Sequence, residues 1–113
     1  MMDGFYAGYF TGISGQGQAI FAMKDGALVG ADAAGVTFDG DYSLANTGEM
    51  KGLVTVKVPA GISIVQGVTA GSQGLTYKVP ITLPADFANR PFITVETPMG
   101  AVNVRLVKVR DFK

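Results

Sequence analysis

The sequence has no cysteine, no histidine and no tryptophan among its 113 residues. Without cysteine, disulfides, thiolate nucleophiles and cysteine-ligated metals are excluded, and the composition fits a reducing compartment. Without histidine, Ser–His and Cys–His pairs are impossible, as is an imidazole base that works near neutral pH. We therefore expect a protein that is not an enzyme and that needs no cofactor.

Charge is also scarce. Only 16% of the residues are charged, the 9 basic and 9 acidic side chains cancel, and hydrophobic residues make up 48%. Because no basic block is present, nothing favours electrostatic capture of nucleic acid, and we expect no direct contact with it. The apolar content argues against disorder, and the length predicts a single domain over residues 1–113.

The chain contains no long apolar segment. The uncharged run 58–77, which no other uncharged run exceeds in length, contains Pro59 and several glycines and is therefore unlike a membrane-spanning segment. Near the N-terminus, Asp3 interrupts any apolar core of a signal peptide. We expect a cytoplasmic protein with no membrane span.

Apolar and polar residues instead alternate with a period of two, which is typical of strands with one wet face. The clearest case is 75–83, where one set is predicted to face the core and the other to face water. The inward set is Leu75, Tyr77, Val79 and Ile81, and the outward set is Thr76, Lys78 and Thr82. Pro80 lacks an N–H donor, so this strand should lie at a sheet edge or carry a bulge.

Turn-forming residues separate these segments. Asp25-Gly26 between two apolar runs is the strongest hairpin signal, and residues 14–17, 46–48 and 98–100 are further predicted turns. Such regular spacing predicts an all-β fold, a small antiparallel up-and-down β-barrel of lipocalin-like form with about eight strands.

Three segments carry additional expectations. Residues 84–89 begin with proline and end with asparagine, which predicts one short helical turn. In the last strand the apolar pattern changes face after Leu106, so a bulge is expected near Leu106-Val107. Residues 59–74 leave two alternatives, a strand or a loop folded over one end of the barrel.

Two groups of side chains are candidates for function. Asp39 and Asp41 share one face of a predicted strand, where they can hold a cation or form an acid–base pair, or can simply be solvated. The first half is rich in aromatic residues interleaved with alanine and glycine. These aromatics either fill the core or line an apolar cavity that takes a small lipid-like molecule. The candidate lining is Phe5, Tyr9, Phe21, Phe38 and Tyr42.

A family resemblance extends across residues 2–40. The pattern consists of Met2-Asp3-Gly4-Phe5-Tyr6 with Phe10, Gly15-x-Gly17 with Ile20, Lys24-Asp25-Gly26-x-Leu28-x-Gly30-x-Asp32, and Phe38-x-Gly40. It resembles the opening half of the GrlR-like family, small negative regulators of type III secretion gene expression. The resemblance implies a lipocalin-like barrel that forms a homodimer and sequesters a DNA-binding transcriptional activator.

One feature departs from that family. Its characterised members carry a short exposed acidic run after the Phe-x-Gly segment, whereas residues 41–49 of this chain have none. Within residues 39–49, we predict that Asp39, Asp41 and Glu49 contact a protein partner. The alternative function is binding or sensing of a small apolar ligand.

Overall fold

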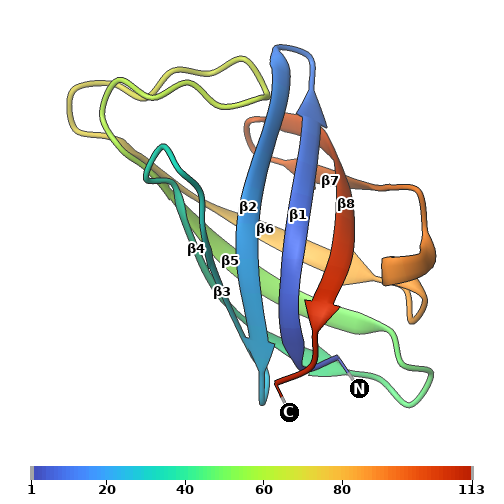
Figure 1. Cartoon of the computed structure of the whole chain (residues 1–113). Coiled ribbons are helices and arrows are strands. Elements are labelled where there is room, and N and C mark those ends of the chain that lie inside the picture. Colours follow the sequence, from blue (N-terminus) through green and yellow to red (C-terminus); the bar gives the residue numbers. More distant parts are fainter. Residues whose placement is uncertain (1, 113) are drawn as a thin grey trace.

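A computed structural model describes residues 2–112, which form eight antiparallel strands and one short 3-10 helix. The strands wrap into a nearly closed barrel (Figure 1), which confirms the predicted all-β fold. The elements are β1 (Gly4–Gly12), β2 (Gly15–Lys24), β3 (Ala27–Ala31), β4 (Thr37–Leu44), β5 (Met50–Val58), β6 (Leu75–Leu83), η1 (Phe87–Asn89), β7 (Ile93–Thr97) and β8 (Gly100–Arg110).

The sheet is a meander that closes between its first and last long strands. Its order is β6-β5-β4-β3-β2-β1-β8-β7, so only the β1–β8 pair joins strands that are distant in sequence. β6 and β7 are the two ends of this order and share no ladder, although they lie close to each other. Pro80 therefore lies on an edge strand, as its missing donor predicts.

Two of the predicted turns show how local chemistry specifies the hairpins. Asp25 and Gly26 join β2 to β3 with φ angles of 51° and 85°, both positive, as a type I′ turn requires. The β1–β2 turn lies earlier than predicted, at Ile13-Ser14, because Gly12 pairs directly with Gly15. Residues 15–17 consequently belong to β2 and not to the turn.

The predicted bulge in β8 is displaced. Val102, Val104 and Leu106 are buried, and Lys108 continues their alternation opposite Tyr6. The register shifts only between Tyr6 and Phe5, which leaves Val109 as the extra residue. The change of apolar pattern after Leu106 thus arises because the apolar Val107 lies on the outer face of β8 while the charged Lys108 takes the inward position.

The register of β6 follows the prediction. Val79 is buried, and Leu75, Tyr77 and Ile81 are half-buried and pack against the core. Thr76, Lys78 and Thr82 are exposed. The predicted helical turn at 84–89 is confirmed in the tighter 3-10 form of η1.

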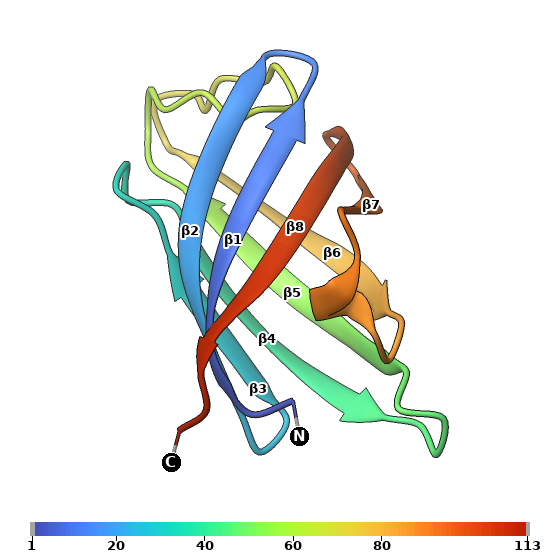
Figure 2. The same cartoon turned by 45° about the vertical axis from the view of Figure 1, so that its right-hand side comes forward.

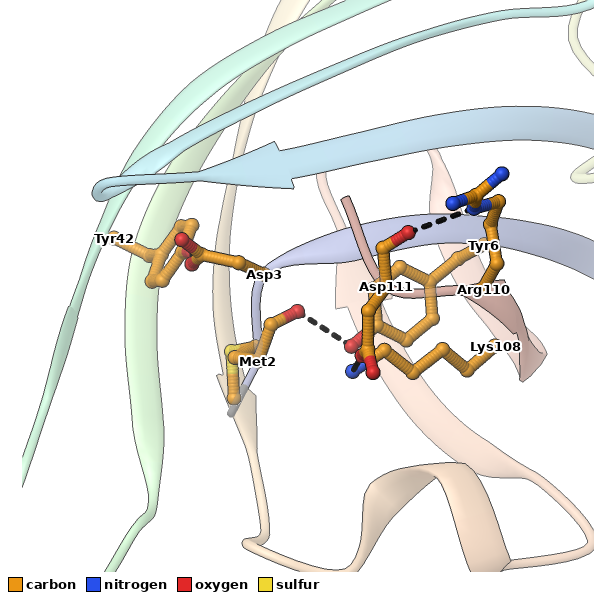
Figure 3. A network of polar contacts seen from close by, with 7 residues as sticks. All are labelled: Met2, Asp3, Tyr6, Tyr42, Lys108, Arg110 and Asp111. Atoms are coloured by element: carbon orange, nitrogen blue, oxygen red, sulfur yellow. Dashed lines mark hydrogen bonds and ion pairs between the residues drawn. The ribbon is translucent and has the colours of Figure 1, made fainter. Parts of the chain in front are cut away.

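The end of the barrel that holds both termini is packed solid. Tyr6 and Met50 are among the largest fully buried side chains, and the Tyr6 ring lies 5.7 Å from that of Phe87. The Tyr6 hydroxyl donates to the Met2 carbonyl at 2.5 Å, and the Lys108 ammonium pairs with Asp111 (Figure 3). These contacts hold Met2 and Asp111 against the barrel.

Residues 59–74 form a loop and not a strand, so the second of the two alternatives holds. The loop lies at the opposite end of the barrel from the termini (Figures 1 and 2), where Ser14 N–H donates to the Val65 carbonyl at 2.9 Å. Ile62, Ile64 and Val65 pack against the core from this loop. In the part of the chain that the structure covers, no helix has the length and apolar character needed to cross a membrane.

Candidate functional site

The barrel interior beneath the 59–74 loop is not filled by side chains and is partly open to solvent. It contains a cavity of about 780 Å³, lined by residues of all eight strands, of the 32–36 turn and of the loop at 62–66. This volume lies in the range of ~300–1,000 Å³ that is usual for small-molecule sites. An eight-stranded barrel is just wide enough either to fill itself with side chains or to hold one small ligand.

Three phenyl rings form one wall of the cavity. Phe10, Phe21 and Phe38 come from β1, β2 and β4, and their centroids are 5.1 to 6.0 Å apart. Phe21 reaches this position because Gly8 and Gly30 flank it. A Cβ at either glycine would approach the Phe21 ring to 2.5 Å. The glycines therefore leave room for the aromatic wall.

The rest of the lining is mainly aliphatic. It is contributed by inward residues of β5, β6 and β8, which are buried because each strand presents alternate side chains to the interior. The principal members are Val54, Val56, Val79, Val102, Val104 and Leu106. This surface favours an apolar occupant through the hydrophobic effect.

A small polar cluster lies within this apolar lining. Gln66 Nε2 is 3.4 Å from both the Tyr77 hydroxyl and Thr97 Oγ1. Thr97 Oγ1 also donates to the Gly100 carbonyl at 2.7 Å and accepts from Met99 N–H at 3.0 Å. Burial raises the pKa of Tyr77, and the bond from Gln66 partly offsets that rise. The cluster is thus neutral.

Among the described residues, Asp32 is the one Asp, Glu, Lys or Arg in the lining. It lies at the β3–β4 turn, where its Oδ1 accepts the N–H groups of Ala34 and Val36 at 2.9 and 3.0 Å. Its carboxylate therefore stabilises that turn. The lining includes no lysine or arginine in residues 2–112, so an anionic group would find no cationic partner there.

The aromatic candidates occupy different parts of the barrel. Phe21 and Phe38 line the cavity, and Tyr9 contributes at its border with 41% of its surface exposed. Phe5 lies instead against Phe112, with ring centroids 4.5 Å apart. Tyr42 lies near Asp3, to which its hydroxyl donates at 3.4 Å (Figure 3).

Four lining residues that matter were not among the cavity candidates from the sequence, although Tyr77 was predicted to face the core. Phe10 has the same parity as the buried Tyr6 and Gly8, so alternation along β1 would have identified it. Gln66, Tyr77 and Thr97 come from the loop, β6 and β7. Only closure of the barrel brings these three together, and no local pattern signals it.

The acidic candidates lie away from the cavity. Asp39 and Asp41 are exposed on the outer face of β4, where they pair with Val29 of β3 and Leu53 of β5 respectively. Glu49 is half-buried in the β4–β5 connection and is separate from them. Within residues 2–112, no three acidic side chains gather closely enough to hold a metal ion.

Comparisons with protein-family models, curated proteins and solved structures found no match to this chain. The resemblance to GrlR-like regulators therefore stays a prediction from the sequence pattern of residues 2–40.

Proposed function

We propose that this protein works by binding and not by catalysis, and that it holds a small, mostly apolar molecule inside its barrel. The observation that carries the proposal is the cavity of about 780 Å³ with its wall of three phenyl rings. Ligand sites are usually concave, mainly apolar and provided with a few polar groups. The cavity meets each of these criteria.

The residue chemistry supports a binding role. The sequence has no histidine or cysteine, so the common nucleophile–base pairs are not available. Asp32 is engaged by two backbone N–H groups at its turn. A cytoplasmic location is part of the proposal, because a chain without cysteine forms no disulfides that would need an oxidising compartment.

A pair of variants on β8 tests the proposal. Val104→Phe adds volume inside the cavity, whereas Val109→Phe makes the same change at an outward position that is 61% exposed. We expect the neutral dye Nile red to bind the wild type and Val109→Phe equally and Val104→Phe more weakly. Native mass spectrometry of the purified protein should also reveal a retained apolar molecule. Failure of the wild type to bind any apolar probe would contradict the proposal.

A second candidate is regulation through a protein partner. The observation that favours it is the mixed surface of β4, where Asp39 and Asp41 lie beside the exposed Val29 and Leu53. Protein-binding surfaces commonly combine apolar contacts with a polar rim. From the resemblance to GrlR-like regulators, the partner would be a DNA-binding transcriptional activator.

Pull-down from the source cells tests this second role. The wild type should retain a transcription factor that a triple alanine variant at Asp39, Asp41 and Glu49 releases. Thr76→Ala and Thr82→Ala, both on the outer face of β6, provide a matched control. Recovery of no transcription factor, together with a stoichiometric ligand in the mass spectrum, would leave the ligand-binding role alone.

We also propose a homodimer that uses the outer face of β8, β1 and β2. Val107 and Ile20 both pair with Ala7 there, and Ile20 is 58% exposed. With few charges, this face can self-associate. Light scattering should give a dimer mass for the wild type and a monomer mass for Ile20→Lys and Val107→Lys. A monomeric wild type would contradict the homodimer, and a dimeric Val107→Lys would exclude β8 from its interface.

A further inference from the structure

We infer that the cavity selects a neutral amphiphile, an apolar chain with one uncharged hydrogen-bonding head such as an alcohol. Its head would lie at the Gln66–Tyr77–Thr97 cluster and its chain along the aromatic wall. The inference rests on the proposed ligand-binding function and adds the chemical class and orientation of the ligand. It follows from the polarity, the hydrogen-bonding capacity and the charge of the lining.

The partly buried, uncharged polar side chains of the lining gather in one cluster, Gln66, Tyr77 and Thr97, at the end of the cavity that the 59–74 loop covers. These three side chains are half-buried. The other uncharged polar residues of the lining are exposed: Tyr9, Thr11, Gln16, Gln18 and Ser63. Between the cluster and the packed end of the barrel, the surface is formed by phenyl and aliphatic groups. A molecule with one polar end can therefore form hydrogen bonds with that end, and bury its apolar chain, in only one orientation.

The cluster can both donate to and accept from such a head group. Gln66 Nε2 donates to the Tyr77 oxygen, which leaves the tyrosine hydroxyl hydrogen available to donate. In the described part of the chain, Gln66 Oε1 accepts no hydrogen bond. Thr97 is already occupied by Gly100 and Met99. An alcohol can accept from Tyr77 and donate to Gln66, which matches this pair.

Charge excludes the common anionic lipids. A carboxylate or phosphate buried in the cavity would meet no lysine or arginine among the lining residues in 2–112. Asp32, in the β3–β4 turn, adds a negative charge to the lining. Because burying an unpaired charge is costly, a fatty acid should bind much less well than the alcohol of the same length.

Isothermal titration calorimetry with 1-decanol, decanoate and decylamine tests the selection directly. We expect 1-decanol to bind at least about tenfold more tightly than decanoate. The free energy that corresponds to a tenfold ratio of affinities is only a small part of the cost of burying an unpaired charge. Equal or tighter binding of decanoate would overturn the inference. Tighter binding of decylamine would also overturn it, because the head group would then be assigned to Asp32.

A variant that removes one hydroxyl tests the orientation. Tyr77→Phe should weaken 1-decanol binding about two- to tenfold, as expected for one neutral hydrogen bond, and should leave 1-decene unaffected. Gln66→Leu, which changes a loop residue, should behave in the same way if Tyr77→Phe is poorly folded. Thr76→Val, at the exposed neighbouring position of β6, is the control and should bind like the wild type.

The outcomes separate this inference from the function on which it rests. If none of the probes binds, the ligand-binding function fails and the inference fails with it. If alcohol, acid and amine bind alike, or if both cluster variants keep full affinity for 1-decanol, the cavity still binds ligands but the assigned head-group site is wrong.

Discussion

Gly30 shows how a residue without a side chain determines the shape of the cavity. An added Cβ would lie 2.5 Å from the Phe21 ring and 2.8 Å from the Ile20 carbonyl oxygen. The backbone carbonyl cannot yield as a flexible side chain would, so Phe21 must move and β3 must shift. The size of the aromatic wall therefore depends on this glycine as much as on the phenyl rings.

We expect Gly30→Ala to lower the free energy of unfolding by about 1–3 kcal/mol, as overpacking usually does. The matched control is Gly71→Ala, because nothing lies within 4 Å of a Cβ at Gly71. The control should remain within about 0.5 kcal/mol of the wild type in urea denaturation. Equal losses in the two variants would contradict the role of Gly30 in fitting Phe21.

Neighbouring positions on β6 test the assignment of its two faces. Val79 is 5% exposed and lines the cavity, whereas Lys78 is exposed on the outer face. Val79→Asp should cost about 3 kcal/mol or more, because it buries a charge without a partner. Lys78→Asp should cost less than about 0.5 kcal/mol. Similar losses of melting temperature in the two variants would contradict this assignment of the two faces.

At the scale of elements, the 59–74 loop depends on a close backbone contact with β1. A Cβ at Gly12 would collide with the Val65 carbonyl, which accepts the N–H of Ser14. Both collision partners are backbone atoms, so the loop must withdraw to make room. The position of the 59–74 loop, which covers the cavity, thus depends on Gly12 of β1.

We expect Gly12→Ala to accelerate amide hydrogen exchange at Ser14 by at least about tenfold, because its acceptor moves away. Gly17→Ala is the control, since its Cβ would make an ordinary contact of 3.4 Å with Val65 Cγ1. Its exchange at Ser14 should match the wild type. Unchanged exchange in Gly12→Ala would show that the loop does not rely on this contact.

At the scale of the whole molecule, stability should decline at high pH. Burial raises the pKa values of Tyr6, Tyr42 and Tyr77 above the ordinary 10.0, because the interior disfavours the phenolate. Above pH 10 the unfolded chain therefore loses these protons before the folded one does. The stability that these tyrosines contribute is complete below that pH and is lost as the pH rises through their raised values.

We expect the melting temperature to fall progressively above about pH 10. Tyr77→Phe should make this decline shallower, because one phenol no longer titrates. Differential scanning calorimetry across the alkaline range measures both effects. A melting temperature that stays level or rises above pH 10 would contradict the assigned direction of the shifts.

The sequence by itself determined the strands and most of the turns. Alternation along β6 placed Val79 inside and Lys78 outside, since side chains on a strand point to opposite faces whatever the strand pairs with. Asp25-Gly26 specified its hairpin because both residues tolerate positive φ. These are effects between near neighbours, so a local pattern suffices to predict them.

Only the tertiary structure decided where the bulge lies, which side chains line the cavity and which residues form its polar cluster. The bulge was expected near Leu106 and occurs at Val109, because pairing with β1 and not the pattern within β8 sets its place. Phe5 was a candidate for the lining but packs on Phe112 once the C-terminal segment follows β8. The cluster of Gln66, Tyr77 and Thr97 joins three segments that meet only because β1 pairs with β8 and closes the barrel. Contacts of this range depend on how the whole sheet curves, and no short stretch of sequence encodes that curvature.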